Sequence, residues 1–187
     1  MVPMPTGERP FAEIAIDFVD KLPESKGFHA ILVVRNRFTK VQPYLPAKTS
    51  RTAADGASEY INEIWQLHGL PIHITSDRGP QFASKFSKEL NRKVHINLRL
   101  STAYLPWTDG LCERAVQTLK QYLRFYCHDR QNHWRAWLPL SEFSYNITST
   151  TTHNYSPHPK LYAFDPRTIH VYNENKLCSP AVEEWLN

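Results

Sequence analysis

The segment FAEIAIDFVD (residues 11–20) reads as a β-strand with an aspartate, Asp17, at its centre. Because side chains alternate along a strand, Ala15, Asp17 and Val19 share one face, and Asp17 has apolar neighbours on that face. Aspartate is depleted in strands, and a buried carboxylate without a partner is costly. A strand interior gives Asp17 no local role, and binding a cation would explain its place there.

The composition of the 187 residues is that of an ordinary soluble globular domain, with 41% hydrophobic and 21% charged residues. A formal net charge of +4 is compatible with a polyanionic partner without being diagnostic of one. The three cysteines form no CxxC pair, so a reducing, intracellular setting is the simpler interpretation. No apolar run is long enough to span a membrane, and the N-terminus lacks the apolar core of a signal peptide.

Hydrophobic periodicity predicts strands and helices on both sides of this first strand. The expected strands are 13–19, 28–37, 38–46, 72–76 and 96–101. The expected helices are 53–68, 84–93, 111–129, 134–146 and a short one near 160–163. The first three strands are separated by short turns, which indicates an antiparallel meander, and the whole order predicts an α/β domain with a central mixed sheet. It is also the order of the ribonuclease H-like fold, although the pattern alone fits several folds.

Two further carboxylates stand at the ends of predicted elements. Asp77 ends a short apolar strand and Glu113 opens a helix. Each has an ordinary explanation, Asp77 as a turn residue before Gly79 and Glu113 as an anion at a helix N-terminus. Together with Asp17, however, they would suit Mg²⁺, a hard ion that takes oxygen ligands. Two such ions can activate a nucleophile and stabilise a leaving oxygen in phosphoryl transfer.

The helix that begins near Glu113 carries a polar stripe. Gln117, Lys120 and Arg124 follow Glu113 at helical spacing. Lys120 and Arg124 would continue the surface of a metal site with phosphate-binding groups. A simple solvated helix face explains the stripe equally well.

Six stretches resemble the integrase catalytic core of gypsy-type LTR retrotransposons, over about residues 8–167. They are FTKVQPYLP (38–46), HGLP (68–71), ITSDRGPQF (74–82), RLSTAYLPWTDGLCER (99–114), SEFSYN (141–146) and SPHPKLYAFDPR (156–167). In that family two aspartates and a glutamate bind the metals, with about thirty-five residues between the second aspartate and the glutamate. Asp77 and Glu113 match that spacing here, and Asp17 matches the first aspartate.

The resemblance implies a ribonuclease H-like fold with a central mixed five-stranded sheet flanked by helices. Residues 10–167 would form the catalytic core, with a loose segment at 1–9 and a tail or linker at 168–187. The implied activity is 3′-end processing of the element's cDNA, followed by strand transfer, in which the freed 3′-hydroxyl attacks a phosphodiester of target DNA.

The resemblance also assigns residues and partners. The catalytic and metal-binding residues would be Asp17, Asp77 and Glu113, holding two Mg²⁺ or Mn²⁺ ions. The expected DNA-binding residues are Trp107, Arg114, Gln117, Lys120 and Arg124. The expected partners are cDNA ends, target DNA and further copies of the chain, because two ends must be joined. The expected location is the nucleus.

The chain departs from the family pattern close to Glu113. The sequence LPWTDG (105–110) stands where His-Pro-Gln-Thr-Asp-Gly is usual, Leu111 and Val116 stand where polar residues are common, and Asn36 replaces a common aspartate. Trp107 could stack on a base or simply pack.

Two alternatives therefore stay open. One is a catalytically impaired or domesticated integrase-like module that binds nucleic acid or a protein partner. The other is an RNA–DNA hybrid nuclease with the same fold and metals, against which the spacing of Asp77 and Glu113 and the HGLP motif argue.

Overall fold

The computed structural model describes eight segments of the chain. They are residues 9–48, 52–76, 78, 80–95, 101–102, 109–127, 130–149 and 155–167, with only the backbone described at 80, 101–102 and 109–115. The predicted termini at 1–9 and 168–187 fall almost wholly outside this part, so those domain boundaries stay predictions. No helix within the described segments is long and apolar enough to cross a membrane.

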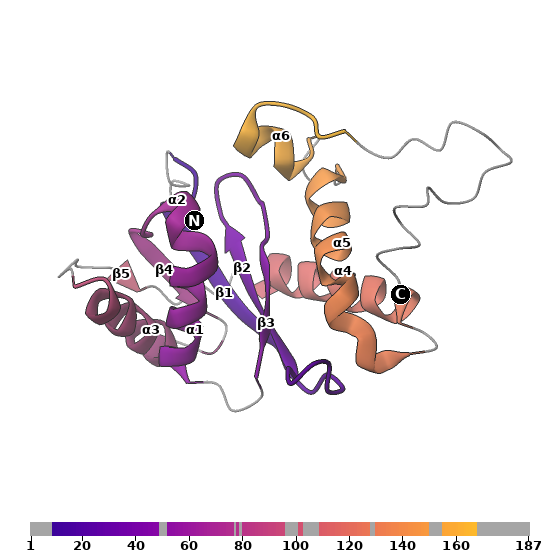
Figure 1. Ribbon diagram of the computed structural model, residues 1–187. Helices are drawn as coiled ribbons and strands as arrows, with labels where there is room; N and C mark the ends of the chain where they lie inside the picture. The colour runs from indigo at the N-terminus through magenta and orange to yellow at the C-terminus, as the bar shows by residue number, and fades with distance from the viewer. Residues whose placement is uncertain are drawn as a thin grey trace, which may run out of the picture.

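A five-stranded mixed sheet forms the centre of the molecule, as predicted (Figure 1). Its strands are β1 (Glu13–Val19), β2 (Ala30–Asn36), β3 (Tyr44–Ala47), β4 (His73–Ser76) and β5 (Ser101–Thr102). They lie in the order β3-β2-β1-β4-β5. The first three strands pair antiparallel as the predicted meander, whereas β4 is parallel to β1 and β5 is parallel to β4. This order puts β1, with Asp17, at the centre of the sheet.

The predicted helices are all present with shifted ends, and a short 3-10 turn, η3, precedes the helix predicted at 134–146. They are α1 (Ala53–Tyr60), η1 (Ile61–Trp65), α2 (Gln66–His68), α3 (Pro80–Lys93), α4 (Asp109–Tyr126), η3 (Gln131–His133), α5 (Trp134–Ile147) and α6 (Pro157–Tyr162). The run from α1 to α2 is the expected helix at 53–68, with a π-helical turn in its middle. It begins at a capping box of Thr52 and Asp55, and Gly69 ends it with a positive φ of 76°.

Two hydrophobic cores lie on opposite faces of the sheet. Helices α1 and α3 cover one face, where the core includes Ile16, Phe18, Tyr60 and Phe86. Helices α4 and α5 cover the other, where it includes Val19. Because residues alternate along β1, the α4–α5 face is also the face of Asp17.

The third strand is shorter and later than the predicted 38–46. Residues 37–39 form a turn, in which the side-chain oxygen of Asn36 accepts the Phe38 N–H at 3.0 Å. The backbone oxygen of Asn36 accepts the Lys40 N–H at 2.9 Å. This Asn-based turn uses the first residues of the predicted strand, so the strand itself begins only at Tyr44, although Val41 and Pro43 still accept backbone N–H groups of β2.

Candidate active site and nucleic-acid interface

Asp17 lies in β1, a strand that pairs with β2 along one edge and with β4 along the other. Its antiparallel neighbour on β2 is Val33, and the side chains before and after it on the same face, Ala15 and Val19, are buried. Asp17 itself is half-buried, and its Oδ1 accepts the N–H of Phe18 at 2.6 Å. A carboxylate is therefore held at the edge of an apolar core, as the sequence predicts.

The end of β4 lies directly beside Asp17. Ser76, the last residue of β4, pairs in parallel register with Ile16, the residue before Asp17. Asp77 follows Ser76 in the sequence but lies outside the described residues. Its predicted role as a metal ligand therefore stays a prediction.

Arg78 connects the exits of β4 and β1. Its guanidinium lies over the ring of Phe18, 4.4 Å from the ring centre, and forms an ion pair with Asp20. The backbone N–H of Arg78 donates to the Ser76 hydroxyl oxygen at 3.2 Å. These contacts fix the segment after β4 against the segment after β1, a role that the sequence analysis did not assign to Arg78. Its position directly after Asp77 was the available signal.

Helix α4 packs on the face of the sheet that carries Asp17. The buried side chains of Val116, Leu119 and Leu123 lie in one core with Val19 and Val33 of the sheet. Val116, which stands where the family pattern commonly has asparagine, is 8% exposed and serves in this packing. The backbone of Glu113 and Arg114 lies in α4, whereas their side chains and all of Trp107 are outside what the structure describes.

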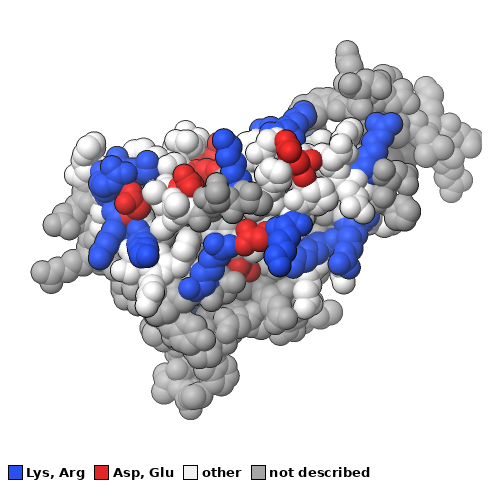
Figure 2. All heavy atoms as spheres, turned by 90° about the horizontal axis from the view of Figure 1, so that it is seen from below, with Lys and Arg blue, Asp and Glu red and all other residues white. Residues whose placement is uncertain are grey.

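The polar stripe of α4 faces solvent. Gln117, Lys120 and Arg124 are exposed, in a stripe that runs beside the buried stripe of the helix. Figure 2 shows one face of the molecule, where Lys and Arg side chains recur with acidic groups between them. Exposure makes contact with phosphates feasible, and that contact stays a prediction. Among the described residues no group of three His, Cys, Asp or Glu side chains could hold a metal; two members of the predicted triad lie outside that set.

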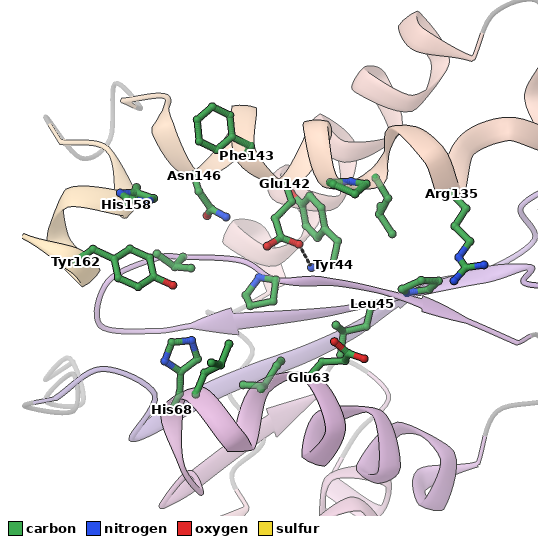
Figure 3. Close-up of a pocket in the computed structure, with 17 residues that line it drawn as sticks. Tyr44, Leu45, Glu63, His68, Arg135, Glu142, Phe143, Asn146, His158 and Tyr162 are labelled. Atoms are coloured by element: carbon green, nitrogen blue, oxygen red, sulfur yellow. Dashed lines mark hydrogen bonds between the residues drawn. The ribbon is translucent and has the colours of Figure 1, made fainter. Parts of the chain in front are cut away.

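A pocket of about 680 Å³ opens elsewhere, beside the edge strand β3 (Figure 3). Residues of β3, of the run from α1 to α2, of α5 and of α6 line it, and none of the predicted catalytic residues does. Glu142 and Asn146 point from α5 toward β3, and Glu142 accepts the N–H of Tyr44 at 2.8 Å. Burial raises the pKa of Glu142 to about 7, although the Tyr44 hydrogen bond opposes the shift. The SEFSYN motif marks this segment in the sequence but predicts no role for either residue.

The arrangement of the sheet and its helices defines the class of protein. It is an α/β domain of the ribonuclease H-like type, built like the catalytic core of a retroviral integrase. The intasome of simian T-cell lymphotropic virus, solved with PP2A regulatory subunit B56 gamma, matches with a TM-score of 0.65 and 21% identity over 95% of this chain and 63% of that one. The HTLV-2 integrase catalytic core, solved with magnesium in a dimeric form, matches with a TM-score of 0.57 and 22% identity over 81% and 97% of the two chains. These likenesses confirm the predicted fold.

Sequence comparison gives the relationship more closely. The Tf2-3 and Tf2-4 transposon polyproteins of Schizosaccharomyces pombe are each 34% identical to the chain over 197 aligned residues, which cover 99% of it. The chain is homologous to these polyproteins and fits the integrase core of an LTR retrotransposon, as its motifs indicate. It spans only 15% of the length of each polyprotein. No protein-family model matches the chain.

Proposed function

We propose that the chain is the metal-dependent polynucleotidyl transferase core of a retrotransposon integrase. It would trim the 3′ end of the element's cDNA and join that end to target DNA. The observation that carries the proposal is the arrangement of three elements: Asp17 lies on the face of β1 that helix α4 covers, and the end of β4 lies beside β1 next to Asp17. The three predicted carboxylates belong to these elements, or directly follow them, in the sequence.

The donor set suits a divalent metal. Asp17 is a carboxylate held half-buried beside apolar side chains, which is an oxygen ligand of the kind that Mg²⁺ and Mn²⁺ prefer. Asp77 and Glu113 would complete the site for two ions. Bound metal would supply charge stabilisation and activation of the attacking water or hydroxyl. That the HTLV-2 core was solved with magnesium supports this assignment.

The chain's own residues would position the reactants. Val116 and Leu119 anchor α4 against the sheet, so the helix that carries Glu113 is fixed relative to the strand that carries Asp17. Lys120 and Arg124, on the exposed side of the same helix, would hold phosphates of the DNA strand. Arg114, Gln117 and Trp107 would add contacts to the DNA near the reacting end. Joining two ends would require at least a second copy of the chain. A reaction that joins cDNA to target DNA would take place in the nucleus.

A disintegration assay tests this function. The substrate is a branched DNA that mimics the strand-transfer product, incubated with Mn²⁺ and the wild-type chain, the Asp17→Asn variant or the Glu113→Gln variant. We expect product from the wild type and none from either variant. Asp165→Asn removes an exposed carboxylate on the segment after α6 and should leave product formation unchanged.

Product that persists in Asp17→Asn would contradict the proposal. A wild-type chain that binds the branched DNA and metal yet forms no product would favour the alternative, a catalytically impaired module. Val116 favours that alternative, because an apolar core residue has replaced a polar group that is common near the catalytic glutamate of the family.

A further inference from the structure

A second pocket lies beside α4, at the opposite end of β1 from its first residue. It has a volume of about 590 Å³ and is formed by the segment that follows β1, by the second half of α4 with Cys127, by η3 and by the start of α5. Its lining residues are Asp20, Lys21, Leu22, Pro23, Lys120, Leu123, Arg124, Cys127, Gln131 and Trp134. We call it the Lys21 pocket.

Positive charge dominates the Lys21 pocket. Lys21, Lys120 and Arg124 are exposed, come from two different elements, and form no ion pair with any residue that the structure describes. Asp20 is the one carboxylate in the lining, and Arg78 already pairs with it. An anion that entered the pocket would therefore meet three cations, with the nearest carboxylate neutralised.

The wall of the pocket is apolar and fixed. Leu123 and Trp134 are buried core residues, and the indole N–H of Trp134 donates to the Pro23 carbonyl at 2.7 Å. The Leu22 N–H donates to the His29 carbonyl at 3.0 Å, which closes the loop between β1 and β2. The backbone is therefore held before Lys21 by strand β1 and after it by the hydrogen bonds of Leu22 and Pro23.

We propose that the Lys21 pocket binds one nucleotide of the DNA strand whose end reaches Asp17. The cations would hold its phosphodiester, and the apolar wall would contact its sugar or base. The pocket is of a size that holds small ligands. The inference rests on the function proposed above, and it adds Lys21 and a defined subsite to the contacts expected of α4.

The position along the strand follows from geometry. Asp20 is three residues beyond Asp17, or at most about 10 Å at the rise of a β-strand. Stacked nucleotides rise by about 3.4 Å each, so the bound nucleotide should be about three positions from the reacting end. The subsite would therefore position the strand before the chemistry begins.

The first experiment compares Lys21→Asn with Lys26→Asn. Both lysines are exposed, belong to the same loop and have a positive φ, 62° for Lys21 and 51° for Lys26, and asparagine is well tolerated in that conformation. Only Lys21 lines the pocket. Binding of a labelled duplex end is measured by fluorescence anisotropy in EDTA over a range of salt concentrations, so that catalysis plays no part.

We expect Lys21→Asn to weaken binding by about five- to eightfold at 0.1 M salt and to reduce the salt slope by about 0.7–0.9, the value of one phosphate contact. Lys26→Asn should match the wild type. Equal behaviour of the two variants, whether both weaken binding or neither does, would overturn the inference.

The second experiment locates the nucleotide. Gln131→Cys places a thiol at the exposed rim of the pocket, and DNA ends carry a thiol-bearing nucleotide at successive positions from the 3′ end. Disulfide formation should peak about three positions in and decline when Lys21→Asn is added. Uniform cross-linking along the strand, or none above that of the parent chain, would contradict the assignment. The disintegration assay with Asp17→Asn tests the proposed chemistry, whereas binding in EDTA and cross-linking test the subsite. Either proposal can therefore fail without the other.

Discussion

The carboxylate of Glu142 on α5 accepts the backbone N–H of Tyr44 on β3, at 2.8 Å. Tyr44 begins the edge strand of the sheet, and its neighbour Pro43 already accepts the N–H of Val34 from β2. Because hydrogen-bonding groups alternate in direction along a strand, the Tyr44 N–H faces away from β2, toward α5. A helix side chain thus takes the place of the missing strand at this edge.

Replacing Glu142 with glutamine should stabilise the protein above neutral pH. Burial raises the pKa of this carboxyl from an ordinary 4.5 to about 7, so the folded state favours the protonated form. The stabilisation from that protonation is full below about pH 4.5 and is lost as the pH rises through 7. Glutamine keeps an oxygen for the Tyr44 N–H without the buried charge.

The measurement is urea unfolding of both proteins at pH 5 and pH 8. Glu142→Gln should be more stable than the wild type by about 1–2 kcal/mol at pH 8 and nearly equal to it at pH 5. Glu63→Gln, at an exposed residue of the same pocket, should show no such difference. A variant that is less stable than the wild type at pH 8 would show that the charge itself is needed.

Asn146→Ala should destabilise the fold by about 2–3 kcal/mol. The amide of Asn146 is buried and pairs with both backbone groups of Gln42, accepting its N–H at 2.9 Å and donating to its carbonyl at 3.3 Å. Alanine would leave both of these buried backbone groups without that partner. Denaturant unfolding provides the test, with Asn62→Ala on the exposed side of η1 as the control. A loss no greater than that of the control would mean that water replaces the amide.

Leu119→Ala should cost about 2–5 kcal/mol. Leu119 is fully buried between α4 and the sheet, so truncation leaves a cavity beneath the helix that carries Glu113. Thermal and urea unfolding would measure the loss, and the exposed neighbour Gln121→Ala should change little. If the helix shifts to fill the cavity, disintegration activity should fall more than the folded fraction does; equal losses would mean that α4 stays in place.

Replacing both Lys120 and Arg124 with glutamine should reduce the salt slope of DNA binding by about 1.4–1.8, since two phosphate contacts are removed. The control pair, Lys85→Gln with Lys88→Gln, removes two exposed charges from α3. A slope that changes equally in both double variants would assign the α4 stripe to general solvation. Titration by anisotropy in EDTA keeps this measurement independent of turnover.

Local signals predicted much of the fold. The helix at 53–68 and the alternation around Asp17 rest on neighbours in the sequence, and both are confirmed. The third strand was placed too early because the Asn36 side chain forms a turn, and periodicity alone does not detect such a bond. The start of α3 at Pro80 was also missed, although proline favours the first turn of a helix.

The same distinction, between signals from neighbours in the sequence and contacts between distant residues, applies to the candidate site. Asp17 is conspicuous because it violates a local rule, and the spacing of Asp77 and Glu113 gains meaning from the resemblance. The roles of Glu142 and Asn146 depend on partners about one hundred positions away, Tyr44 and Gln42. No local pattern encodes such a pairing. The Lys21 pocket was missed for the same reason, because it exists only where the loop after β1 meets α4.

The closure of the β3 edge has a consequence for the order in which the chain folds. The meander is synthesised long before α5, so its outer edge stays open until α5 has emerged. An open edge is a template for pairing with other chains. Pro46 has no N–H, so it cannot donate to another strand at that position. The N–H groups of Tyr44 and Gln42 gain their partners, Glu142 and Asn146, only when α5 packs on this edge. A chain truncated before α5 should therefore aggregate during synthesis, even though every strand of its sheet is present.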